Sequence, residues 1–279
     1  MVRTEYLPVA GGRVAYEVAG EVDGPLVVCV HGLGESRRTF RFLVPLLADA
    51  GYRVAAMDVR GYGESAGEWQ DYSVESVGAD MLALTWQLGG PAVVVGHSIG
   101  GASAAWAAAE APEAISGLVL IGTSAFETPV KAWMKPLAAV VCGSAALWGV
   151  YCKSLFITVK PADLRQYVTG MKASLRRRGG IAPLRAQNKE LASGVRPRYP
   201  EVRCPALILM GARDKDLPDP AAEASLVARR LAGPATVTVV PDSGHYVQIE
   251  MPDQAAAAII PFAAGQLGFL ASDVPLTDG

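Results

Sequence analysis

Short apolar runs alternate with longer stretches of helical periodicity through most of the chain. Six mainly apolar runs are typical of strands that are covered on both faces: residues 26–30, 54–57, 92–95, 118–121, 206–210 and 236–240. Helical patterns lie between or after them, at residues 39–50, 73–88, 99–110, 220–231 and 252 to about 270. Upstream, residues 6–9 and 14–19 flank Gly11-Gly12 and predict a hairpin at one edge of the sheet.

This alternation predicts an α/β fold, with a mostly parallel eight-stranded sheet flanked by helices. It breaks between residues 126 and 203, where helical patterns continue without a convincing strand and several aromatic residues gather. We therefore expect a core of residues 1–125 and 204–279, interrupted after the sixth strand by a helical cap of residues 126–203. The aromatic residues of the cap could form its own packing core or line a pocket.

Composition narrows the classes of partner and location. The chain has 279 residues, of which 51% are hydrophobic and 19% charged, with a formal net charge of −2. With so few charged residues, the chain has little material for a basic stripe that could neutralise nucleic-acid phosphates. We therefore expect no nucleic-acid partner. The N-terminus lacks the apolar run of a signal peptide, and the four cysteines form no C-x-x-C pair, which favours reduced thiols in the cytoplasm.

Two uncharged stretches are too short or too interrupted for a membrane span. Residues 81–109 are broken by Gly89-Gly90-Pro91, and residues 136–152 contain Gly143 and Gly149. We expect both to be buried or to face a pocket. The three histidines form no i, i+4 pair or Cys/His cluster, so no metal site is expected.

One motif carries chemistry. Gly96-His97-Ser98-Ile99-Gly100-Gly101 follows a predicted strand and opens an alanine-rich helix. Strand, G-x-S-x-G and helix in that order is the context of a nucleophile elbow, whose tight turn needs small residues at positions 96 and 100. Ser98 is therefore the candidate nucleophile.

With four further motifs in order, the chain resembles the α/β-hydrolase fold superfamily, in the subgroup with a helical cap. These motifs are His31-Gly32-Leu33-Gly34, Asp58-Val59-Arg60-Gly61-Tyr62-Gly63-Glu64-Ser65, Gly211-Ala212-Arg213-Asp214 and Ser243-Gly244-His245. The resemblance covers nearly the whole chain. It implies a serine hydrolase with the order Ser98, acid, His245, in which Asp214 is the first choice of acid and Asp216 and Glu127 remain alternatives.

The resemblance also suggests supporting residues. Backbone N–H groups of Leu33 and Ile99 would form the oxyanion hole. Candidate pocket residues are His31, His97, Trp133, Trp148 and Tyr246, although His31 and His97 are expected to support their loops rather than transfer protons.

The implied reaction needs neither a metal nor an organic cofactor. The preferred function is hydrolysis of an ester or lactone of a small to medium apolar substrate through an acyl-enzyme. Relatives with epoxide hydrolase or dehalogenase chemistry carry Asp in place of Ser98, which disfavours those reactions. A C–C hydrolase of vinylogous diketones, a thioesterase, a perhydrolase or a tailoring enzyme stays open, as does a ligand-sensing receptor. A homodimer is compatible with the sequence.

Overall fold

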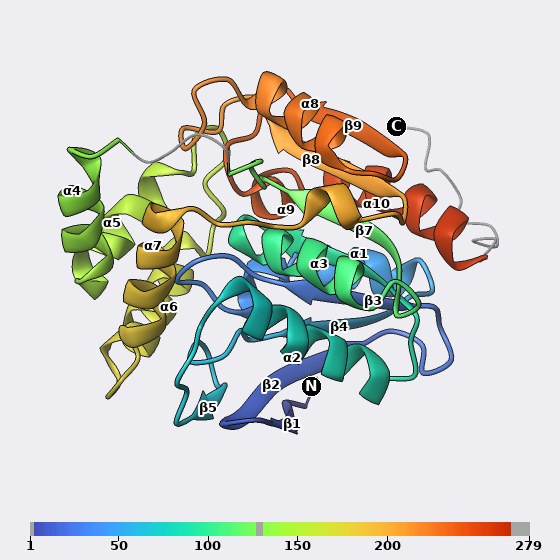
Figure 1. Ribbon diagram of the computed structural model, residues 1–279, viewed down its shortest axis with the longest axis horizontal. Coiled ribbons are helices and arrows are strands. Elements are labelled where there is room, and N and C mark those ends of the chain that lie inside the picture. The colour runs from blue at the N-terminus through green and yellow to red at the C-terminus, as the bar shows by residue number, and fades with distance from the viewer. Residues whose placement is uncertain (1–2, 127–130, 269–279) are drawn as a thin grey trace.

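The computed structural model describes residues 3–126 and 131–268, which form one twisted sheet with helices on both sides (Figure 1). The strand order is β1-β2-β4-β3-β6-β7-β8-β9, and all pairs from β4 to β9 are parallel. The strands of this path are β1 Glu5–Val9, β2 Gly12–Ala19, β3 Leu26–Val30, β4 Arg53–Met57, β6 Ala92–His97, β7 Ile115–Ile121, β8 Ala206–Gly211 and β9 Ala235–Val240. Each of the eight predicted strands is therefore present.

The sheet also has a ninth strand that was not predicted. β5 consists of Ala66–Gly67 alone and pairs with the start of β2 in antiparallel orientation. Two residues carry no periodicity, so the sequence pattern could not indicate it.

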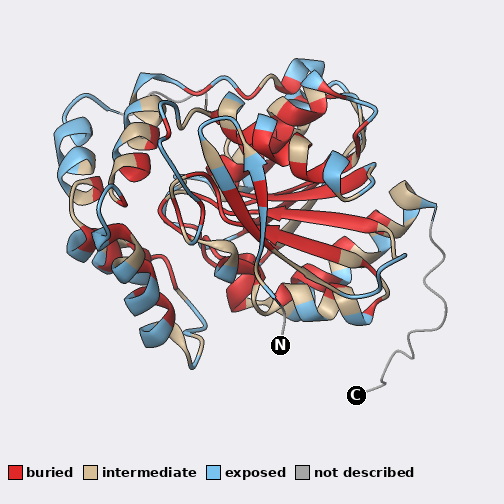
Figure 2. Ribbon diagram, turned by 90° about the horizontal axis from the view of Figure 1, so that it is seen from below, coloured by how far each residue is buried: buried red, intermediate tan, exposed pale blue. Residues whose placement is uncertain are grey.

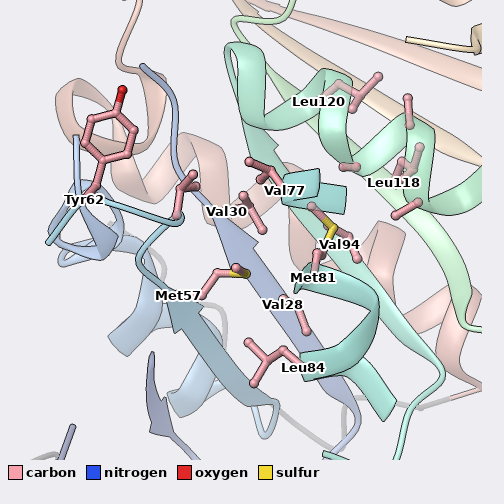
Figure 3. Packing of buried hydrophobic residues seen from close by; sticks show 14 of the residues in the cluster. Val28, Val30, Met57, Tyr62, Val77, Met81, Leu84, Val94, Leu118 and Leu120 are labelled. Carbon is pink, nitrogen blue, oxygen red and sulfur yellow. The ribbon is translucent and has the colours of Figure 1, made fainter. Parts of the chain in front are cut away.

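The central strands are apolar throughout because each of their faces is covered by a different helix layer. Alternate residues such as Val28, Val94 and Leu118 pack on one side with α2 (Val74–Gln87), α3 (Ile99–Glu110) and α8 (Pro220–Arg230). Figure 3 shows this packing, with Val77, Met81 and Leu84 of α2 over β3, β4 and β6. The intervening residues pack on the other side with α1 (Leu43–Asp49) and α10 (Pro252–Leu267). A short helix, α9 (Val247–Glu250), precedes α10.

Two predicted helix boundaries differ from the structure. The pattern at residues 39–50 is a 3₁₀ turn, Arg37–Phe40, followed by α1 from Leu43. Pro45 accounts for the late start, because its missing N–H costs no intrahelical hydrogen bond when it lies in the first turn of α1. At the other end of the chain α10 ends at Leu267 rather than near residue 270.

Four helices lie between β7 and β8, to the left of the sheet in Figure 1. They are α4 (Met134–Cys142), α5 (Ala145–Ser154), α6 (Leu164–Arg176) and α7 (Ala182–Ser193). Residues 131–203, all described, contain no strand. Hydrogen bonds join these helices to the rest of the chain. Arg41 donates two, of 2.6 and 2.7 Å, to Asp163 at the start of α6, and the Tyr62 hydroxyl donates one of 2.9 Å to Gln187 of α7. The division into core and cap at residues 126 and 203 stays a prediction.

The expectation that residues 136–152 are buried or face a pocket is wrong for their outer face. Leu137 and Val140 are each 59% exposed and Val150 is 67% exposed. Figure 2 shows the outermost helix, α4, exposed along most of its length. Helical periodicity could not reveal this exposure, because nearly every residue of α4 is apolar.

Among the described residues, no single helix is long and apolar enough to cross a bilayer. By length and composition, α4 and α5 qualify only as a pair, and the two are bent by 111° at their junction.

A buried ion pair fixes the loop after β4 to helix α2. The Arg60 guanidinium donates to both carboxylate oxygens of Asp80, at 2.7 and 2.8 Å, and also lies over the Trp69 ring. Asp80 is only 2% exposed, and its burial raises the pKa of the carboxyl although Arg60 opposes the shift.

Asp80→Asn should therefore destabilise the fold by about 3 kcal/mol, because it leaves the buried guanidinium without its anion. The free energy of unfolding from urea titration measures this loss. Glu75→Gln, an exposed change on the same helix, should stay within about 0.5 kcal/mol of the parent protein. Equal losses in the two variants would contradict a stabilising role of the ion pair.

Candidate active site

Ser98 sits in a strained turn between β6 and α3. Its backbone has φ 53° and ψ −125°, a conformation that costs a non-glycine residue free energy and is found at functional sites. The turn is held by hydrogen bonds from Ser98 N to the Ile121 carbonyl, at 2.9 Å, and from the Thr123 hydroxyl to the Ser98 carbonyl, at 3.1 Å. A Cβ at Gly96 or Gly100 would lie 2.6 or 2.5 Å from neighbouring backbone. The turn therefore requires glycine at both positions, as the motif predicts.

His245 and Asp214 form a buried pair on the loops that follow β9 and β8. Their Nδ1 and Oδ2 atoms are 2.7 Å apart, and the two residues are 6% and 3% exposed. The second carboxylate oxygen of Asp214 accepts the Asp216 N–H at 2.9 Å. Because a carboxylate only accepts, Nδ1 of His245 carries a proton and Nε2 is the acceptor of the neutral ring.

The pair shifts the pKa values of both members. Burial alone would lower the pKa of His245, but the negative charges of Asp214, Asp216 and Glu35 outweigh it and raise the pKa. Burial alone would raise the pKa of Asp214, but the neighbouring His245 reverses this and lowers it. Asp214 thus favours the imidazolium that a general base becomes when it takes a proton.

The other candidate acids have different surroundings. Asp216 accepts a hydrogen bond of 2.5 Å from the Tyr151 hydroxyl and does not bond to the imidazole. Glu127 lies outside the described residues. Asp242, which was not a candidate but lies three residues before His245, pairs with Arg213 at 2.9 Å, and both side chains are more than half exposed. Of the described candidates, Asp214 alone is hydrogen-bonded to His245.

The loop after β3 lies against the nucleophile. A Cβ on Gly32 would come within 2.9 Å of the Ser98 Cβ. His31 braces this loop, because its Nε2 accepts the Val59 N–H at 2.9 Å and its Nδ1 lies 2.8 Å from the Gly32 carbonyl. Leu33 and Ile99, the predicted oxyanion-hole residues, pack in the same small apolar cluster beside Ser98's helix.

Glu35 is a feature of the site that sequence reasoning missed. Its carboxylate is 4% exposed and lies 3.2 Å from Nδ1 of His97, while Nε2 of His97 lies 3.1 Å from the His245 carbonyl. Both ring nitrogens of His97 therefore face an oxygen atom. Burial would raise the pKa of Glu35, but His97, His31 and His245 lower it to about 2. The only signal was a carboxylate directly after a glycine-rich loop.

Glu35 and His97 join three loops of the site. Gly32 N donates to Glu35 at 3.4 Å, His97 precedes the nucleophile, and His245 is the candidate base. The ring of His97 also lies 4.7 Å from that of His245. His97 thus contacts both the Glu35 carboxylate after β3 and the loop that carries His245.

The remaining predicted pocket residues separate into an inner and an outer group. Trp148 of α5 packs directly on Gly34. A Cβ added to Gly34 would lie only 2.3 Å from Nε1 of Trp148. Tyr246 stacks on Phe156, with ring centroids 4.7 Å apart, and lies 5.2 Å from His97. Trp133, in contrast, is 69% exposed and lies at the surface.

A cavity of about 1420 Å³ lies between α6 and the core segment around Arg37. Glu35 and Tyr167 form part of its wall, whereas Ser98, Asp214 and His245 do not line it. Arg37 pairs there with Glu17, Asp58 and Glu64, so its charge is already balanced. The cavity thus reaches Glu35, the residue that contacts His97.

One further arrangement at this site is a group of potential metal ligands. It consists of Asp214, Asp216 and His245, whose ligand atoms lie within 4.8 Å of one another. Asp214 and Asp216 already accept hydrogen bonds from His245 and Tyr151, respectively. The donor set therefore fits an acid and base pair without a metal.

Comparison with known proteins decides the family. The model of the alpha/beta hydrolase family matches residues 27–258. The chain belongs to this alpha/beta hydrolase family. The fold predicted from the motifs is thereby confirmed, and the family includes hydrolases.

Two curated proteins and one solved structure illustrate what the chain is similar to. The chain is 30% identical to a dihydrolipoyllysine-residue acetyltransferase component of the acetoin cleaving system of Pseudomonas putida, over 90% of this chain and 67% of that protein. It is 28% identical to a 2-(acetamidomethylene)succinate hydrolase of Mesorhizobium japonicum, over 90% and 92%. A bromoperoxidase structure from Bacillus anthracis superposes with a TM-score of 0.79 at 21% identity, over 94% and 99%, and supports the fold alone.

Asp214→Asn should lower kcat by about 10⁴-fold if this carboxylate orients the base. Hydrolysis needs neutral His245, so activity rises with pH through the pKa of the imidazole. Removing the Asp214 charge lowers that pKa, and the acid limb of the kcat/KM profile should move to lower pH.

Asp216→Asn is the matched control, because it changes a carboxylate in the same loop that bonds to Tyr151 instead. We expect it to cost far less activity. A larger loss for Asp216→Asn than for Asp214→Asn would transfer the role of acid to Asp216.

Proposed function

We propose that the protein is a serine hydrolase that cleaves an ester or lactone of a small to medium apolar substrate. The buried hydrogen bond between His245 and Asp214, on loops beside the strained Ser98, carries this proposal. A serine hydroxyl is a weak nucleophile and needs a base that a third group orients. The named hydrolase among the relatives supports hydrolysis as the class of reaction.

In the proposed mechanism, Ser98 Oγ attacks the ester carbonyl and gives its proton to Nε2 of His245. The tetrahedral oxyanion accepts hydrogen bonds from the backbone N–H groups of Leu33 and Ile99. His245 then protonates the leaving alcohol, or the ring oxygen of a lactone, and an acyl-Ser98 ester remains. Water, deprotonated by His245, hydrolyses this ester and restores the serine.

Aromatic side chains near the site support an apolar substrate. Trp148 covers Gly34 of the loop that would hold the oxyanion, and Tyr246 and Phe156 stack close to His97. Ligand pockets commonly combine such apolar walls with a few polar anchors. The acyl group would therefore contact rings rather than charges.

Ser98→Ala should abolish multiple turnover on p-nitrophenyl esters and labelling by a fluorophosphonate, because no acyl-enzyme can form. A panel of esters, lactones, thioesters and a vinylogous diketone, assayed with both proteins, identifies the bond that is cleaved. Fastest turnover of the diketone would replace the ester by a C–C substrate. Labelling of Ser98 with single-turnover acylation on every substrate would favour a ligand sensor over an enzyme.

Trp148→Ala should shift the preference among p-nitrophenyl esters toward longer acyl chains, since it removes a ring next to the oxyanion loop. The ratio of kcat/KM for octanoate to that for acetate should rise by about ten-fold, within the range of hydrophobic discrimination by a pocket. Trp86→Ala, an exposed tryptophan of α2, is the control and should leave the ratio unchanged. Equal losses on both esters would instead indicate disruption of the oxyanion loop.

A further inference from the structure

The outer face of α4 and α5 carries the densest group of exposed apolar side chains in the described part of the chain. The exposed fractions are 69% for Trp133, 41% for Met134, 59% each for Leu137 and Val140, 43% for Leu147 and 67% for Val150. We call these six residues the cap-tip surface. Residues 134, 137 and 140 recur at helical spacing, so they share one side of α4. Contiguous exposed apolar patches mark interaction sites, unlike scattered single residues.

The cap-tip surface has no cover within the chain. α4 packs against α5 and α7, and its inward residue Cys142 is buried. In both views α4 is the outermost helix, on the side away from the sheet (Figures 1 and 2). α5 has two different faces, because Trp148 and Cys152 are buried toward the core while Leu147 and Val150 are exposed. The apolar outer face therefore does not serve the packing of the cap.

The charged side chains that α4, α5 and their flanking residues carry are all positive. Residues 131–162 include Lys131, Lys135, Lys153 and Lys160 and contain no aspartate or glutamate. Lys135 donates to the Ala192 carbonyl in the last turn of α7. On the adjoining helices, Arg185 donates to the Gly143 carbonyl at the α4–α5 turn, and the Lys172 stem lies beside Gly149. The carboxylate that contacts α5, Asp216, bonds to Tyr151.

An apolar face whose own segment, residues 131–162, carries lysines and no acidic residue matches a negatively charged lipid surface. Interfacial helices bury their apolar side chains at the headgroup boundary, while lysines attract anionic lipids. A second copy of this chain fits less well, since a two-fold contact through the same surface would bring lysines toward lysines. The 111° bend between α4 and α5 suits helices that lie along a surface rather than cross it.

We propose that the cap-tip surface docks the protein peripherally on membranes that contain anionic phospholipid. This proposal concerns a surface outside the candidate active site and does not depend on the reaction that the site catalyses.

Co-sedimentation of the full chain with sucrose-loaded vesicles tests the docking. The protein should bind to vesicles of equal parts phosphatidylglycerol and phosphatidylcholine. It should bind much less to vesicles of phosphatidylcholine alone. The double variant Leu137→Ser, Val140→Ser should lower the partition coefficient by about ten-fold or more, because it removes apolar contacts with the lipid. Val22→Ser changes a valine of the β2–β3 loop that is 75% exposed, and it should leave binding unchanged.

The electrostatic part is tested separately. Lys131→Gln with Lys153→Gln should reduce binding to anionic vesicles by roughly twenty-fold, since each lysine near such a surface contributes about five-fold. Lys189→Gln, an exposed lysine of α7, is the control. Circular dichroism spectra and melting temperatures that match those of the parent protein would show that the variants are folded.

Three results would overturn the proposal. The first is absence of binding to both kinds of vesicle, and the second is an equal loss in the variants and their controls. The third is a concentration-dependent dimer in light scattering that Leu137→Ser, Val140→Ser abolishes, because the surface would then be an interface between copies.

Discussion

The parallel strands of the sheet are apolar on both faces, and this burial decides where charged side chains can lie. Residues of β3, β6 and β7 point alternately into the layer of α2 and α3 and the layer of α1 and α10, with no room for an unpaired charge in either. Polar chemistry is therefore confined to the loops at the strand ends. In a parallel sheet the carboxyl ends share one edge, so segments far apart in the sequence meet there: Glu35, His97, Ser98, Asp214 and His245 all follow or end strands of this edge.

At that edge, charges are balanced within the protein. The His245 imidazole faces Asp214, and the His97 imidazole faces Glu35, so each buried carboxylate has a buried ring beside it. Polar side chains paired in this way lose hydration on burial and add stability only when geometry and further hydrogen bonds offset that loss. Backbone N–H groups of Asp216 and Gly32 provide such bonds to Asp214 and Glu35. The arrangement fixes the positions of the loops more than it stabilises the chain.

The sequence contained most of the fold and the central residues of the candidate site, because these follow from local patterns. Apolar runs predicted six strands and the Gly11-Gly12 turn predicted the hairpin of the other two. The glycines around Ser98 predicted the turn whose strained backbone the structure shows. The strand β5 was missed because it consists of two residues, which is too short for a periodic pattern. The start of α1 was missed because it depends on a single proline. Exposure on α4 and the contact of Glu35 with His97 depend on three-dimensional neighbours, which an apolar helix or a single glutamate does not specify. Trp133 illustrates the same limit, since its type suited a pocket but its position faces solvent.

The pairing of Glu35 with His97 also bears on how this chain can change over generations. Either residue alone would be a buried charge or polar ring without its partner, and removal of one member of such a pair typically costs about 3–5 kcal/mol. Most domains have a total stability of only about 5–15 kcal/mol, so a lineage that loses one member first passes through a poorly folded intermediate. The two positions are therefore epistatic: they should be inherited as a unit, and an apolar replacement becomes accessible only when both change together.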